Sequence, residues 1–213
     1  MAITTYSELL TAVNSHLDRS DISSFIPDFV VFFESLVNYG DDEMSFDGLR
    51  VRDMITTSSS NTPDASGNIT LATDFLAMDR RVVYQDADPR GLNFMTAVQM
   101  EEDYPTTDTG ATAFYTIVGN VLRIRPNGTS LVDYDYFQSI PALVTNSTNW
   151  LLTKSPQAYL YGTLYFTQIF LENPDGAVGM FKLMRSALGG IRAADKVLTH
   201  GSLRPQGYGA PSW

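Results

Sequence analysis

The spacing of apolar residues changes twice along the chain, and this change restricts the possible folds more than any other feature. Apolar side chains recur at helical spacing in residues 5–17 and 24–39, and again in 156–172 and 175–198. Residues 49–138 instead hold short runs of alternating apolar and polar residues, separated by turn-forming residues. The sequence therefore predicts an α+β protein, in which a helical bundle from the N- and C-terminal segments carries an inserted antiparallel β-rich domain.

This organisation predicts four parts of the 213-residue chain. Residues 1–48 form the N-terminal helices of the bundle, residues 49–138 the inserted β-rich domain, and residues 139–198 the C-terminal helices. Residues 199–213 form an extended tail that is rich in glycine and proline and has no apolar periodicity. Within the insert, residues 58–68 are predicted to be a polar loop, and residues 40–48 an acidic connector.

The helical segments carry recognisable local signals. Thr5 and Glu8 have the spacing of a capping box, and Ser155 followed by Pro156 is typical of a helix start. The pair Gly189-Gly190 predicts a bend or a close helix contact, since each glycine costs about 1 kcal/mol relative to alanine. The aromatic stripe of residues 24–39 is interpreted as core packing. Its members are Phe25, Phe29, Phe32, Phe33 and Leu36.

The best-specified part of the insert is a hairpin in residues 112–128. Gly119 and Asn120 separate two alternating runs, and both residue types tolerate the positive φ that a two-residue hairpin turn requires. The hairpin holds no plausible catalytic group. Its predicted role is structural, to fix the register of the paired strands.

Composition excludes several classes of chemistry. The chain has no cysteine, and its two histidines, His16 and His200, are far apart in sequence. Disulfides and thiolate nucleophiles are therefore excluded, and we expect no metal and no cofactor. Asp133 and Asp135 lie on one face of a predicted strand, but nothing nearby supplies the contrast in pKa that a catalytic pair needs. We expect no enzymatic activity.

The net charge of −10 is unevenly distributed. Residues 1–60 carry −7, residues 61–150 carry −6, and residues 151–213 carry +3. An acidic body is unsuited to gripping nucleic acid, because phosphate binding depends on clustered lysine and arginine. The acidity serves solubility, or it keeps part of the surface from adhering to something negative.

No targeting or membrane segment is evident. The first basic residue is Arg19, and the longest compact apolar run, residues 29–33, is far shorter than a membrane span.

Several pieces in fixed order resemble the tailed-phage head-to-tail adaptor proteins, also called connector or head-completion proteins. The pieces are LRVRDM, NITLATDFLAMDRRVVYQD, ATAFYTIVGNVLRIRPNG and the VDYDYFQ…NWLLTKSPQAYLYGTLYF stretch, and the likeness covers about residues 4–198. The acidic residues 40–48 and the tail depart from the family's pattern.

The resemblance implies a structural adaptor of a bacteriophage virion. Such adaptors form a dodecameric ring that joins the portal protein to a downstream tail protein (a nozzle or tail fibre), and DNA passes through the channel without sequence-specific binding. It also implies a protein made in the host cytoplasm and located in the head–tail neck of the virion, with no membrane partner. The tail's composition and the resemblance together make Arg204, Tyr208 and Trp213 the expected portal contacts.

Two other functions remain open from the sequence. In a carbohydrate- or receptor-binding tail module, Tyr134 and Tyr136 would form an aromatic sugar platform. In a tail-associated hydrolase, Asp133 and Asp135 would be the acid pair.

Overall fold

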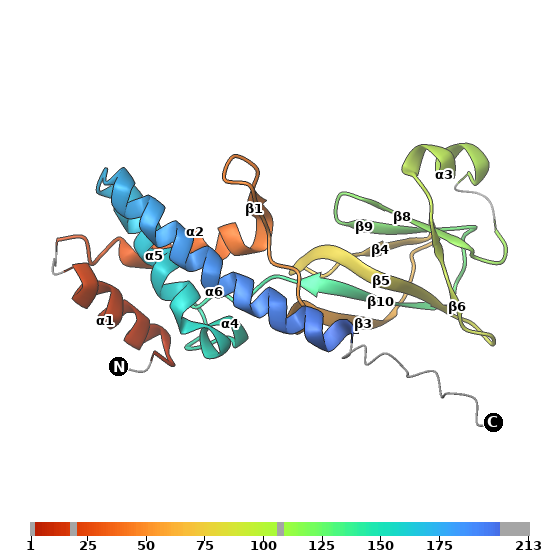
Figure 1. The fold of residues 1–213 in the computed structure, drawn as a ribbon. Coiled ribbons are helices and arrows are strands. Elements are labelled where there is room, and N and C mark those ends of the chain that lie inside the picture. Colours follow the sequence, from red (N-terminus) through yellow and green to blue (C-terminus); the bar gives the residue numbers. More distant parts are fainter. Residues whose placement is uncertain (1–2, 18–20, 106–108, 201–213) are drawn as a thin grey trace, which may run out of the picture. The chain divides into compact units, whose positions relative to one another are not determined.

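The computed structural model describes residues 3–17, 21–105 and 109–200 (Figure 1). These residues form a mixed α+β protein with six helices and mainly antiparallel sheets, so the predicted class is confirmed. The chain divides into two compact units. We call residues up to Arg52 together with those from Ile140 onward the helical unit, and Asp53–Ser139 the β unit.

The described residues of the helical unit form five helices and one small hairpin. They are α1 (Tyr6–Leu17), α2 (Ile26–Tyr39), β1 (Gly40–Asp41), β2 (Phe46–Asp47), α4 (Trp150–Lys154), α5 (Pro156–Phe170) and α6 (Pro174–His200). Helices α1, α2, α4 and α6 all contact α5, and α6 runs alongside α5 (Figure 1). Helix α5 is therefore the element around which this unit is organised.

Helix α1 begins with the predicted capping box. The Glu8 carboxylate accepts hydrogen bonds from the N–H groups of Thr4 and Thr5, at 2.7 and 3.0 Å. The Glu8 N–H donates in return to the Thr5 hydroxyl at 3.3 Å. These bonds use backbone donors that a helix start leaves without partners inside the helix.

The helices α2 and α5 approach each other at a glycine. A Cβ atom at Gly162 would lie 2.0 Å from a ring carbon of Phe33, and both residues are buried. Phe33 also packs edge-on against Tyr159, with ring centroids 4.9 Å apart. Only glycine leaves room for the Phe33 ring at this point.

A buried polar cluster ties the returning chain to α2. The Glu34 carboxylate accepts the Leu143 N–H at 2.9 Å and the Tyr159 hydroxyl at 3.0 Å. Asn149 donates to the same Tyr159 oxygen at 2.6 Å, and Asn38 accepts the Ile140 N–H at 3.0 Å. Burial raises the pKa of Glu34, although the two hydrogen bonds partly offset this effect.

In the β unit, the residues that the structure describes form two four-stranded sheets. One has the order β3 (Ile55–Asn61), β10 (Leu131–Gln138), β5 (Phe75–Gln85) and β6 (Arg90–Gly91). The other has the order β4 (Asn68–Thr70), β9 (Val121–Arg125), β8 (Phe114–Val118) and β7 (Asn93–Phe94). Helix α3 (Ala97–Asp103) contacts β8, and a 3₁₀ turn, η1 (Arg52–Met54), precedes β3.

One hydrophobic core joins the two sheets of the β unit. It takes Val82, Val132 and Tyr134 from the first sheet, and Leu122 and Ile124 from the second. In the hairpin β8–β9, Val118 pairs with Val121 around a turn in which Gly119 has φ +61°. Asn120 does not adopt a positive φ, so the glycine alone meets this requirement of the turn.

Three segments adopt a local structure different from the one expected from their sequence. Residues 49–51 are not a strand, because Leu49 and Val51 are buried and the Leu49 N–H bonds the Val37 carbonyl of α2. Strand β3 continues to Asn61, through residues expected to be loop, because β10 pairs with it along this length. The acidic residues 40–48 form the β1–β2 hairpin, not an irregular connector.

Two predicted helix signals also act differently from expectation. Ser155 occupies the N-cap of α5 without a side-chain cap bond, whereas Asn149 caps the short α4 by accepting the Leu152 N–H at 2.8 Å. Helix α6 continues through Gly189 and Gly190, and nothing lies within 4 Å of a Cβ built at either residue. A close contact with the described part of the chain therefore does not explain this pair.

Candidate assembly surfaces

The outward side of α2 exposes large apolar side chains. Phe25, Val31, Phe32 and Tyr39 are 44, 43, 50 and 72% exposed, whereas Phe29, Phe33 and Leu36 are buried. The expectation that the whole aromatic stripe is core was therefore wrong. A helix that is apolar around more than half its circumference cannot bury every side against one neighbour.

The exposed aromatic residues of α2 continue onto α5. Ring centroids lie 5.2 Å apart for Phe25 and Phe170, and 5.8 Å apart for Phe32 and Phe166. Phe170 is 48% exposed. We call Phe25, Phe32, Phe166 and Phe170 the aromatic face. Such a contiguous apolar surface is typical of a site that another molecule covers.

A second apolar surface lies between α5 and α6. It is a groove of about 440 Å³. Its lining is Met44, Tyr165, Ile169, Pro174, Ala177, Val178, Phe181, Lys182 and Arg185. We call it the α5–α6 groove. Val178 is 54% exposed, and the Tyr165 ring contacts Phe166 of the aromatic face at 5.0 Å.

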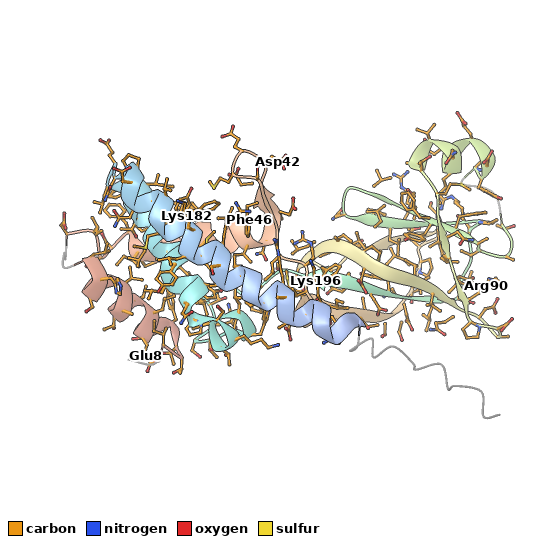
Figure 2. All side chains as sticks on the ribbon, in the orientation of Figure 1. Glu8, Asp42, Phe46, Arg90, Lys182 and Lys196 are labelled. Carbon is orange, nitrogen blue, oxygen red and sulfur yellow. The ribbon has the colours of Figure 1, made fainter. Side chains whose placement is uncertain are left out.

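Charged side chains lie beside both surfaces. Lys182 and Arg185 are the cations of the α5–α6 groove, and Figure 2 shows Lys182 on α6. The Arg185 guanidinium lies over the Phe181 ring, 5.7 Å from its centroid. Asp28, on α2, is exposed beside the aromatic residues of that helix. The α6 side of the groove is therefore basic, although acidic charge also reaches the groove, where burial and the charge of Asp41 in the β1–β2 hairpin raise the pKa of Tyr165.

Not every basic residue of α6 is available to a partner. Arg192 donates to the carbonyls of Asp47 and Gly48 and lies over the Phe46 ring at 5.4 Å. Arg52 pairs with Asp195 at 3.2 Å. These contacts hold α6 against β2 and the residues that follow it, so Arg192 belongs to the fold of the unit.

The β unit has two neighbouring grooves that share Arg123 and Arg125. Their volumes are about 590 and 270 Å³. Arg123 pairs with Glu101 at 3.1 Å, while buried Arg125 donates to the carbonyls of Ser66 and Ile124. Burial lowers the pKa of Arg125. Both arginines thus bind acceptor groups of their own chain. Neither groove brings together an acid and a base in an arrangement suited to catalysis.

The predicted sugar platform is wrong. Tyr134 and Tyr136 are only 2 and 5% exposed and belong to the core of the β unit. The Tyr136 hydroxyl donates to Asp74 at 2.9 Å, and burial raises the pKa of Tyr136 to about 12. A sugar ring could not stack on either tyrosine.

The aspartates on either side of Tyr134 bind groups of their own chain. Asp133 accepts the Ser60 N–H at 2.6 Å and the Gln85 amide at 2.7 Å. Asp135 accepts the Thr57 hydroxyl at 2.6 Å. All three partners lie on strands adjacent to β10, so these carboxylates stabilise strand pairing.

The predicted portal contacts Arg204, Tyr208 and Trp213 lie outside the described residues. Within the described ranges, histidine, aspartate and glutamate nowhere gather in threes to form a possible metal site. No helix in this part of the chain is long and apolar enough to cross a membrane. The aromatic face and the α5–α6 groove are thus the surfaces that the sequence did not reveal. The signal for them was an aromatic stripe too wide for a single packing partner.

An α+β chain whose most distinctive surfaces are uncovered and apolar has the character of an assembly protein. A family model described as SU10 adaptor protein matches residues 4–206. The chain therefore belongs to the SU10 adaptor family, a family of phage head-to-tail adaptors, which confirms the resemblance noted in the sequence. It is a phage adaptor protein, a structural protein and a component of the virion. No curated protein matches the chain.

Proposed function

We propose that copies of this chain form a ring that joins the portal protein to the tail and lets DNA pass through its channel. The observation that carries the proposal is the aromatic face, which stands uncovered beside the α5–α6 groove in a member of a head-to-tail adaptor family. Burial of apolar surface is the main favourable contribution to most protein association. The copy number of twelve rests on the family resemblance.

In the proposed ring the helical unit is a bundle that contacts neighbouring copies. Its close packing supports this role, since Gly162, Phe33 and the Glu34 cluster hold α2 against α5. A fixed relation between two helices presents their exposed side chains in one geometry, which lowers the entropic cost of association.

The net charge of −10 supports a channel that conducts DNA. Negative walls repel phosphate and keep DNA from adhering during passage. The basic residues of α6 that remain exposed, Lys182, Arg185 and Lys196, are candidates for contacts with acidic protein surfaces.

Mass measurement tests the ring directly. The protein is examined by native mass spectrometry and light scattering, alone and with the portal protein of the same phage. We expect a multiple of the chain mass to appear on the portal, even if the free chain is monomeric. Binding of only one copy to a whole portal assembly, or no binding at all, would contradict the proposal.

The tail and the β unit are proposed to face different partners. Deletion of residues 199–213, with Arg204, Tyr208 and Trp213, should abolish portal binding; a tail with the same residues in scrambled order is the control. Unchanged binding after deletion would exclude the tail as the portal contact.

Crosslinkers placed in virions at residues 62–67, between β3 and β4, should capture a downstream tail protein. Capture of the portal instead would reverse the proposed orientation.

A further inference from the structure

We propose that the aromatic face of one copy docks into the α5–α6 groove of the next copy. The inference rests on the proposed ring and specifies its interface. The groove is the acceptor for one or more of the exposed rings Phe25, Phe32 and Phe170.

Symmetry requires two different surfaces. A ring is built from head-to-tail contacts, in which one patch of a subunit meets a different patch of its neighbour. The aromatic face consists of partly exposed rings at α2 and α5, whereas the groove is a hollow lined by Tyr165, Val178 and Phe181. Each copy thus carries both halves of one contact.

The size of the groove fits aromatic occupants. A cavity of about 150 Å³ is enough to hold a benzene-sized ring, and the groove has a volume of about 440 Å³. Its lining is mainly apolar, and Met44 from the turn between β1 and β2 adds a flexible side chain that adapts to the ring that enters.

Charge favours a second copy as the occupant. Asp28 lies on the helix that projects the rings, and Lys182 and Arg185 lie on the helix that borders the groove. When the aromatic face of one copy enters the groove of another, acid meets base at the edge of the contact. Opposite charges at an interface rim favour the correct pairing and the rate of encounter more than the final affinity.

The absence of cysteine makes a direct test simple. Phe32→Cys and Val178→Cys are prepared as separate proteins, mixed, bound to the portal protein of the same phage, and treated with a short bismaleimide crosslinker. Phe32 and Val178 are both exposed, so folding should be retained, which circular dichroism checks. We expect a mixed dimer at about ten times the yield given by Thr11→Cys mixed with Val178→Cys; Thr11 is exposed on α1, outside both surfaces.

The double variant F32C/V178C distinguishes the direction of pairing. Head-to-tail contacts should give a ladder of covalent products beyond the dimer, whereas a two-fold contact would stop at the dimer and overturn the proposal. A mixed yield equal to that of the Thr11 control would also overturn it. If copies still assembled on the portal in that case, the proposed ring would stand and only this interface would fall.

A charge swap adds an independent readout. Asp28→Lys should weaken crosslinking between Phe32→Cys and Val178→Cys about threefold, and Lys182→Glu in the partner should restore it, as expected for a partly exposed ion pair. Lys196 lies on α6 outside the groove. If Lys196→Glu restored crosslinking as well as Lys182→Glu does, the pairing of Asp28 with Lys182 would be contradicted.

Discussion

Two groups of aromatic side chains, one in each unit of this protein, differ sharply in exposure. In the β unit, Tyr84, Tyr134 and Tyr136 are almost completely buried in the core between the sheets. In the helical unit, Phe25, Phe32 and Phe170 remain about half exposed although they contact one another or other rings. Strand alternation assigns one side of each strand to the core. A helix distributes its apolar residues around an axis, so those beyond the reach of its neighbour stay uncovered.

This difference predicts that aromatic truncation has unequal effects in the two units. Tyr134→Ala should lower the free energy of unfolding of the β unit by about 4 kcal/mol, because it empties a buried site. Phe32→Ala should cost the helical unit less than about 1 kcal/mol, since surface changes are usually small. Urea unfolding combined with hydrogen exchange measures each unit separately. Equal losses would mean that Phe32 is part of the core after all.

Two glycines on helices provide the next contrast. Gly162→Ala should destabilise the helical unit by about 3 kcal/mol, because the new methyl group would overlap the Phe33 ring. Gly189→Ala has open space around it and should stabilise α6 by up to about 1 kcal/mol through helix propensity. Thermal denaturation of both variants checks the signs. A stabilising Gly162→Ala would show that α2 and α5 are not closely packed.

The smallest expected effect concerns pH. Burial raises the folded-state pKa of Glu34 above its value of about 4.3 in unfolded chains. Its contribution to stability is therefore fully present below that unfolded value and is lost as pH rises through the raised folded value. Glu34→Gln should remove this decrease of stability with rising pH, because glutamine does not titrate. The variant's free energy of unfolding should stay within about 1 kcal/mol of that of the wild type.

Glu8 is the matched control, because hydrogen bonds from Thr4 and Thr5 lower its pKa in the folded state. Its contribution is present above the unfolded pKa and is lost as pH falls through the lowered folded value. The stability of Glu8→Gln relative to wild type should change with pH in the opposite direction to that of Glu34→Gln. Denaturant unfolding from about pH 4 to pH 7 compares them; the same pH trend in both variants would contradict the assignment.

Much of the local structure could be predicted from residue type. The capping box at Thr5 and Glu8, the strand alternation that buries Tyr134 and Tyr136, and the cross-strand pairs of β8 and β9 all depend on neighbours a few residues away. Failures occurred where distant segments intervene. Leu49 and Val51 alternate like a strand but pack in the helical unit, and β3 is extended by its pairing with β10.

The sequence alone determined the class of this protein: helix periodicity at both ends, strand alternation between them, and the ordered motifs of a phage adaptor family. These are properties of short segments, and the physics of capping, alternation and turns acts within those segments. Only the tertiary structure decided which aromatic residues of α2 are core and which remain exposed. That choice depends on where α5 lies against α2, and a close approach at Gly162 sets this position from more than a hundred residues away in the chain.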